Sequence, residues 1–227
     1  YAGGERLGIA ESRILDALSA AEVSGSEPAG PDALAVTVTL DGVSVPAVFR
    51  RLDEDAVARE LAAYRLDRLL DIGLVPPTVA REIEGRKGVL QLRPGRIVSH
   101  AALQAAGQGI QQSWCPVTPQ YQLLYAFDTL LLNERRTPDS ILYDTDRWMV
   151  MSTAHDASFG TARRLPRQLA NTPLEPLPGL IDRLDSLTEA ELQDALGSLL
   201  SKREIKAIIE RARLLPRGAA AAAAAAH

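Results

Sequence analysis

The chain has 227 residues, of which 46% are hydrophobic and 24% are charged, and its formal net charge is -4. This is the composition of a globular protein with a hydrophobic core, long enough for one two-lobed domain or two small ones. The negative charge argues against nucleic-acid binding, and no apolar run approaches the roughly 20 residues that span a bilayer. The single cysteine, Cys115, excludes an internal disulfide and is interpreted as a half-buried structural thiol.

Both ends of the chain are excluded from the functional interpretation. The sequence begins at Tyr1 without a methionine, so we expect a fragment that can lack a targeting signal. It ends in Gly218, alanines at 219–226 and His227, which we interpret as an expression tag or an unassigned tail over 219–227. The compartment is left open, between a bacterial cytoplasm and an exported protein whose signal is missing.

The first half of the chain predicts a small sheet with a helix against it. In chain order we expect a helix at 11–21, strands at 34–40 and 43–50, a long helix at 53–70, and a hairpin with strands at 78–83 and 89–92. Gly25 and Gly30 fit either a phosphate-covering loop or an ordinary turn. Pro46 places part of its strand at an edge or a bulge, because proline cannot donate a ladder hydrogen bond.

The second half predicts mainly helices after a break at Pro94-Gly95. The expected helices are 99–106, 119–132, 180–187, 189–200 and 202–215. Capping boxes, Thr188 with Glu191 and Ser201 with Glu204, fix the start of the last two. The sequence therefore predicts an α+β fold with a mixed lobe at 1–93, a helical lobe at 94–218, a hinge at 90–95 and a cleft between the lobes.

One stretch, residues 121–160, orders its elements as kinase-like folds do around their catalytic and metal-binding loops. It predicts a helix, a polar loop, a two-strand hairpin and a second polar loop that ends in Phe159-Gly160. The segments RELAAYRLDRLLDIGLVPPTVAREIEGRKGVLQL, FDTLLLNERRTPDSILY and AHDASFG resemble bacterial relatives of the secreted four-jointed and Golgi casein-kinase family. The resemblance covers residues 11–213 and implies a two-lobed kinase-like fold, distantly similar to phosphatidylinositol kinases and HipA-like toxins.

The resemblance implies a nucleotide cleft in which several positions have changed. Arg50 stands where the family has a phosphate-binding lysine, and Glu60 stands where a helix glutamate orients that lysine. These two residues either serve a ligand or form an ion pair that braces strand to helix. Gln91 and Leu92, within the expected hinge at 90–95, complete the positions that contact a nucleotide if one binds.

The catalytic and metal-binding positions have also changed. The family reads Asn-any-Asp-Arg, whereas this chain reads Asn133-Glu134-Arg135-Arg136, and a guanidinium at 135 cannot accept a proton. Ser140 stands where the family has a metal-binding asparagine, and Ala154 where it has a metal-binding aspartate. His155 is interpreted as a hydrogen-bonded spacer, and the pattern identifies no partner for His100.

Three interpretations remain open. The first is a pseudokinase that binds or scaffolds another protein, holds no metal, and takes either no cofactor or ATP without metal, with Arg50 and Arg135 supplying positive charge. The second is an active atypical kinase that uses Glu134, Asp139 and Asp156. The third is an assembly subunit whose cleft is closed by its own side chains, such as Arg135 paired with Asp156. No interpretation predicts the oligomeric state, and none calls for nucleic acid or a membrane span.

Overall fold

The computed structural model describes residues 5, 6, 8–40, 42–110 and 116–217. Cys115 and the tail from Gly218 lie outside the described residues. The helices are α1 Glu11–Ala20, α2 Glu54–Leu69, α3 His100–Ala105, α4 Val117–Leu131, α5 Pro178–Ser186, α6 Glu189–Leu196 and α7 Lys202–Ala212, with short 3-10 turns η1 Pro138–Ser140 and η2 Arg167–Leu169. The strands are β1 Glu5–Arg6, β2 Ile9–Ala10, β3 Val23–Gly30, β4 Ala33–Leu40, β5 Val43–Arg51, β6 Thr78–Ile83, β7 Arg86–Leu92, β8 Ile97–Ser99, β9 Ile141–Asp144 and β10 Met149–Ser152.

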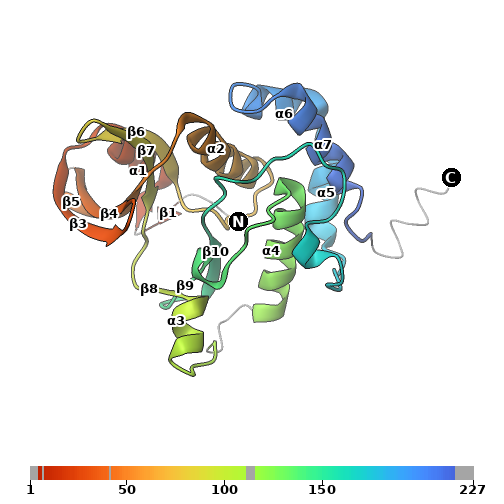
Figure 1. Ribbon diagram of the computed structural model, residues 1–227, viewed down its shortest axis with the longest axis horizontal. Helices are drawn as coiled ribbons and strands as arrows, with labels where there is room; N and C mark the ends of the chain where they lie inside the picture. The colour runs from red at the N-terminus through yellow and green to blue at the C-terminus, as the bar shows by residue number, and fades with distance from the viewer. Residues whose placement is uncertain (1–4, 7, 41, 111–115, 218–227) are drawn as a thin grey trace.

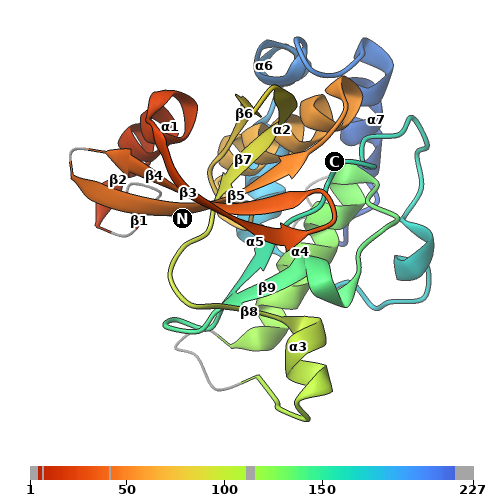
Figure 2. The ribbon, with the colours of Figure 1, turned by 60° about the vertical axis from the view of Figure 1, so that its left-hand side comes forward.

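A five-stranded antiparallel sheet of order β3-β4-β5-β7-β6 forms one side of the molecule (Figures 1 and 2). Successive side chains of a strand point to opposite faces of the sheet. Phe49 and Leu90 belong to an apolar core that also contains Ile14 and Leu18 of α1, so α1 covers one face. Arg50, one residue beyond Phe49, therefore points to the other face.

Strand β3 departs from the predictions. The turn or loop expected around Gly25 is wrong, because this residue lies in a bulge of β3, where the register with β4 shifts between Ser24 and Ser26. The strand was missed because VSGSEPAG lacks alternation, and almost all of its side chains are exposed at the sheet edge. Gly30 ends β3 at the tight connection to β4.

Pro46 lies in β5 where the sequence led us to expect an edge. Residues Val43–Pro46 pair only with β4, since the pairing of β5 with β7 begins at Ala47 and Leu92. The Pro46 carbonyl accepts a hydrogen bond from Arg93 N at 2.9 Å. The backbone nitrogen of Pro46, which has no hydrogen to donate, therefore faces the end of β7. The pairing of β5 with β4 is uninterrupted at Pro46 and has no bulge there.

The other side of the molecule is built from helices around a three-stranded sheet of order β10-β9-β8. Its core gathers Phe127 and Leu130 of α4, Leu192 of α6 and Ile208 of α7. Both predicted capping boxes, at Thr188 and Ser201, are present. His100 finds the partner that the sequence did not identify, because its Nδ1 lies 2.9 Å from the Tyr143 hydroxyl.

Helix α2 lies between the two halves. Asp53 caps its start by accepting from Ala56 N at 2.8 Å, as the acidic first turn predicts. Its buried residues Ala62, Ala63 and Leu66 belong to the core of the helical side rather than to that of the sheet and α1. The division at residue 93 stays a prediction. Within the described part of the chain, no helix has the length and apolar character needed to cross a membrane.

Candidate functional site

A cleft of about 480 Å³ lies between the sheet face that carries Arg50 and the β8–β9 region. Its lining includes six residues that the sequence analysis singled out: Arg50, Gln91, Leu92, Asp139, Ser140 and Ala154. Arg93 adds a second cation. Three of the four predicted nucleotide-contacting positions and both expected metal positions thus line one cavity, whereas the fourth, Glu60, is buried outside the lining.

Arg50 enters the cleft from β5 and meets two carboxylates. Its Nη2 forms an ion pair with Glu60 Oε1, and its Nη1 lies 3.7 Å from Asp156 Oδ1. Nη2 is buried, yet it has no well-oriented hydrogen-bond partner among the described residues. The ion pair between strand and helix is therefore present, while donor capacity of the guanidinium is left over.

Glu60 is completely buried in α2 and is held as an anion. His155 N donates to its Oε1 at 2.7 Å, and His155 Nδ1 lies 3.3 Å from its Oε2. Burial by itself raises the pKa of Glu60, but the hydrogen bond from His155 and the charge of Arg50 outweigh it and bring the pKa down to about 2. His155 also contacts Ser152 Oγ at 2.8 Å, so it is the hydrogen-bonded spacer that the sequence suggested.

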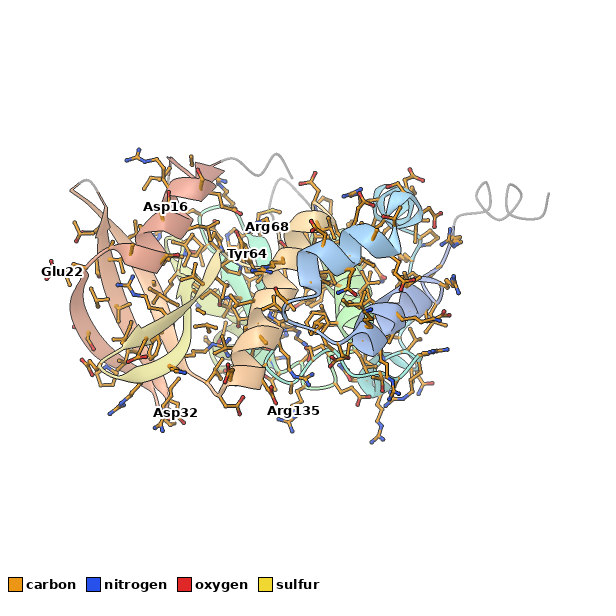
Figure 3. The ribbon with its side chains drawn as sticks, turned by 90° about the horizontal axis from the view of Figure 1, so that it is seen from above. Asp16, Glu22, Asp32, Tyr64, Arg68 and Arg135 are labelled. Atoms are coloured by element: carbon orange, nitrogen blue, oxygen red, sulfur yellow. The ribbon has the colours of Figure 1, made fainter. Side chains whose placement is uncertain are left out.

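The catalytic-loop positions lie away from the cleft lining. Asn133 is buried and donates from Nδ2 to Asp128 Oδ1 at 3.1 Å, while its own Oδ1 accepts from Arg135 N at 3.0 Å. The Arg135 side chain is exposed and points away from the molecule (Figure 3). The ion pair suggested between Arg135 and Asp156 is wrong, because Asp156 lies 3.7 Å from Arg50 Nη1 instead.

Glu134, the suggested base of an atypical kinase, is already engaged. Its Oε1 accepts from Arg164 Nη1 at 2.6 Å and from Arg167 N at 3.3 Å. The hydrogen bond from Arg164 lowers the pKa of this carboxyl. A carboxylate stabilised in its ionised form by an arginine is a weaker proton acceptor than a free one.

A buried network that the sequence analysis did not single out fixes this loop. Arg136 donates to Asp128 through Nε at 3.0 Å and Nη2 at 2.6 Å, and through Nη1 to Thr153 O at 2.7 Å and Ser140 Oγ at 3.2 Å. The sequence held a signal, because an aspartate in the apolar run of α4 needs a charged partner if it is buried. Arg136 therefore holds the loop in position through buried contacts and does not line the cleft.

The residues at the expected metal-binding positions do not fit a magnesium ion. Ser140 Oγ accepts from Thr137 N at 3.1 Å as well as from Arg136, and donates to Thr137 O at 2.9 Å. Ala154 offers only a methyl group and adopts a left-handed backbone with φ of 58°. Among the described residues, no three or more His, Cys, Asp or Glu side chains form a group that could hold a metal.

Arg211 ties three segments behind this site and was not singled out by the sequence. It is fully buried and donates to Leu130 O at 3.0 and 2.8 Å, to Gly160 O at 2.9 Å and to Ala162 O at 2.8 Å. Burial lowers the pKa of its guanidinium to about 10, against the raising effect of Glu204. Helix α7 thereby anchors the end of α4 and the segment that follows Phe159.

Comparison with known proteins bears on the fold. No protein-family model matches the sequence, and no curated protein sequence matches it. Among solved structures, the Helicobacter pylori proinflammatory kinase CtkA is similar with a TM-score of 0.55 at 9% identity, over 87% of this chain and 92% of CtkA. HipA of Shewanella oneidensis, solved with HipB and operator DNA, gives a TM-score of 0.36 at 12% identity, over 89% of this chain and 62% of HipA. The likeness to CtkA confirms the predicted α+β kinase-like fold, and at such low identity it extends no further than the fold.

Proposed function

We propose that this kinase-like chain does not transfer phosphate and instead acts as a binding or scaffolding domain for another protein, with a cleft that accepts an anion such as ATP without a metal ion. The charge of the cleft lining carries this proposal. Among the described lining residues, Arg50 and Arg93 are cations, Asp139 is the single carboxylate, and Ala154 is apolar. This balance favours an anion over a divalent cation.

The two cations would contribute differently. Glu60 compensates much of the charge of Arg50 and engages its buried Nη2, so Arg50 would act mainly through Nη1, which lies 3.7 Å from Asp156 Oδ1. Arg93 is exposed at the cleft wall and would supply charge with less compensation. A phosphate group could accept from both without the magnesium that active kinases use.

The test is a titration of the full chain with ATP by calorimetry, once with EDTA and once with magnesium or manganese. We expect equal or tighter binding with EDTA, and up to about 5-fold weaker binding by Arg93→Ala, the loss typical of one exposed ion pair worth roughly 0.2 to 1 kcal/mol. Arg163→Ala is the matched control, because Arg163 is exposed and lies outside the linings of both the cleft and the other depressions of the described residues. Binding that requires a divalent ion would refute the proposal, as would phosphate transfer.

The active atypical kinase is a second candidate, and one observation favours it. Asp139 lines the cleft and is available there as a carboxylate. Asp156 and Glu134 would first have to leave Arg50 and Arg164. Transfer of radiolabelled phosphate from ATP that disappears in Asp139→Ala or Asp156→Ala would establish this alternative. Membership of the four-jointed family likewise stays a prediction.

A further inference from the structure

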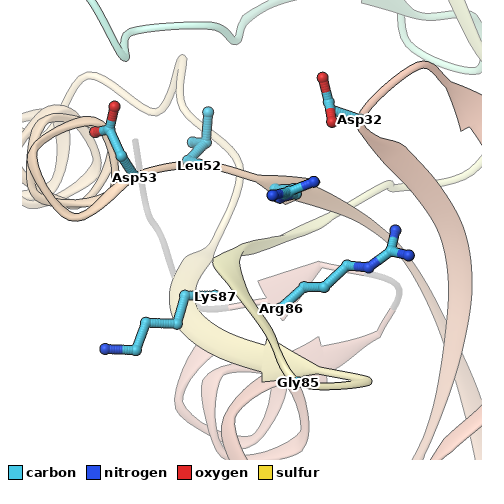
Figure 4. A pocket seen from close by; sticks show the side chains of 7 residues that line it. Asp32, Leu52, Asp53, Gly85, Arg86 and Lys87 are labelled. Carbon is cyan, nitrogen blue, oxygen red and sulfur yellow. The ribbon is translucent and has the colours of Figure 1, made fainter.

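A second depression, of about 510 Å³, lies at the end of the five-stranded sheet, outside the cleft. Its lining comes from the end of β5, the N-cap of α2, the β3–β4 connection and the β6–β7 turn (Figure 4). Three cations lie in it: Arg51, Arg86 and Lys87. Two carboxylates, Asp32 and Asp53, share the lining, so the depression is positive by one formal charge in a chain whose net charge is -4.

The three cations have not been neutralised by the protein. Within the described part of the chain, none of them forms an ion pair or a side-chain hydrogen bond. Of the two carboxylates in the lining, Asp53 is occupied in capping α2 through Ala56 N. In Figure 4, Arg86 extends toward the side on which Asp32 lies, whereas Lys87 extends the other way, below Asp53.

The backbone under these side chains is fixed. Arg51 N donates to Asp32 O at 2.9 Å, and Leu52 N donates to Lys87 O at 3.3 Å. Strands β5 and β7 approach so closely that a Cβ on Gly88 would lie 2.1 Å from Arg50 O, which glycine alone avoids. The cations therefore project from a rigid frame, and binding there costs little ordering of the main chain.

We propose that this depression is a docking site for an acidic, extended segment of a partner protein. Arginine binds carboxylates through paired hydrogen bonds, and two arginines on neighbouring strands can take two acidic side chains of one extended peptide. The depression is open and Leu52 is its one apolar side chain among the described lining residues, so it lacks the enclosure that a nucleobase or drug-like ligand needs.

This site is independent of the anion cleft. Arg50 and Arg51 are adjacent in β5 and point to opposite faces, so one cation serves the cleft and the next serves the depression. Either site can therefore fail in experiment without affecting the other.

The test measures binding of a fluorescein-labelled hexaglutamate peptide to the full chain by anisotropy at low salt. We expect the double variant Arg51→Ala/Arg86→Ala to bind about 2- to 30-fold more weakly, since two exposed ion pairs contribute roughly 0.2 to 1 kcal/mol each. The matched control is Arg163→Ala/Arg203→Ala, which removes two exposed arginines elsewhere and leaves the same net charge. We expect this control to bind like the unmodified chain.

The site is located by nuclear magnetic resonance. Peptide added to the labelled chain should shift the amide signals of Leu52, Gly85 and Gly88. Equal losses in the two double variants would refute the proposal, as would the absence of binding or shifts confined to other residues. A single-stranded oligonucleotide of the same charge that bound more tightly and lost affinity in the same variant would overturn the assignment to a protein partner.

Discussion

Replacing Glu60 by glutamine should remove a defined part of the acid sensitivity of the fold. A carboxyl whose pKa falls from 4.5 to about 2 on folding contributes roughly 3 kcal/mol to the free energy of unfolding at pH 7. Because the folded-state pKa is lowered, this stability is complete above the unfolded value of 4.5 and is lost as the pH falls through about 2. The contribution shrinks to about 1.5 kcal/mol at pH 3 and to under about 0.5 kcal/mol near pH 2.

The assay is urea unfolding followed by circular dichroism, at intervals from pH 7 to pH 3. We expect the gap in unfolding free energy between the unmodified chain and Glu60→Gln to narrow by about 2 kcal/mol over this range. Glu82→Gln is the matched control, because Glu82 is exposed on β6 and its substitution should leave the pH dependence unchanged. A gap that stays constant from pH 7 to pH 3 would refute the assignment of Glu60 as a buried anion held by His155 and Arg50.

Three further substitutions test residues in and behind the site, each by the urea midpoint. Asp128→Asn should cost about 3 to 5 kcal/mol, because it leaves the buried charge of Arg136 uncompensated; a cost under about 1 kcal/mol would contradict the buried pair. Arg211→Met should cost at least about 3 kcal/mol, since it leaves buried carbonyls such as that of Leu130 without donors, and an unchanged midpoint would contradict that role. Ala154→Gly should stabilise the chain by about 0.5 to 1 kcal/mol by relieving a left-handed alanine, and a loss of stability would show that the φ of 58° carries no strain.

Elements defined by local chemistry could be predicted from the sequence. Helix α2 was expected at 53–70 and runs from Glu54 to Leu69, because an acidic cap, an apolar side and Gly73 mark its ends within one short stretch. The capping boxes at Thr188 and Ser201 were predicted correctly for the same reason, because each is defined by residues three apart in the sequence. Strand β3 could not be predicted, because its pairing with β4 is made by the backbone of polar, exposed residues and leaves no periodic pattern.

The part of the candidate site that could be predicted is the pair of residues that the sequence placed on a strand and on the helix that follows it. Arg50 and Glu60 were expected either to bind a ligand or to pair, and the pair is present. The predicted partner of Asp156, Arg135, was wrong. The choice between Arg50 and Arg135 depends on the path of a loop, and the sequence does not determine that path. Arg211 was missed because an arginine in an amphipathic helix is usually exposed, although it falls three residues after Ile208 on the buried side.

The ion pair between Arg50 and Glu60 connects the two halves of the molecule through helix α2. The helix is embedded by apolar contacts in the core that α4, α6 and α7 share, whereas Arg50 belongs to the sheet. The Arg50 guanidinium therefore links the five-stranded sheet to a helix that is packed in a different hydrophobic core. An anion that drew Arg50 away from Glu60 would weaken this contact between the sheet and α2, so binding in the cleft and attachment of the sheet to the helices would then be thermodynamically linked.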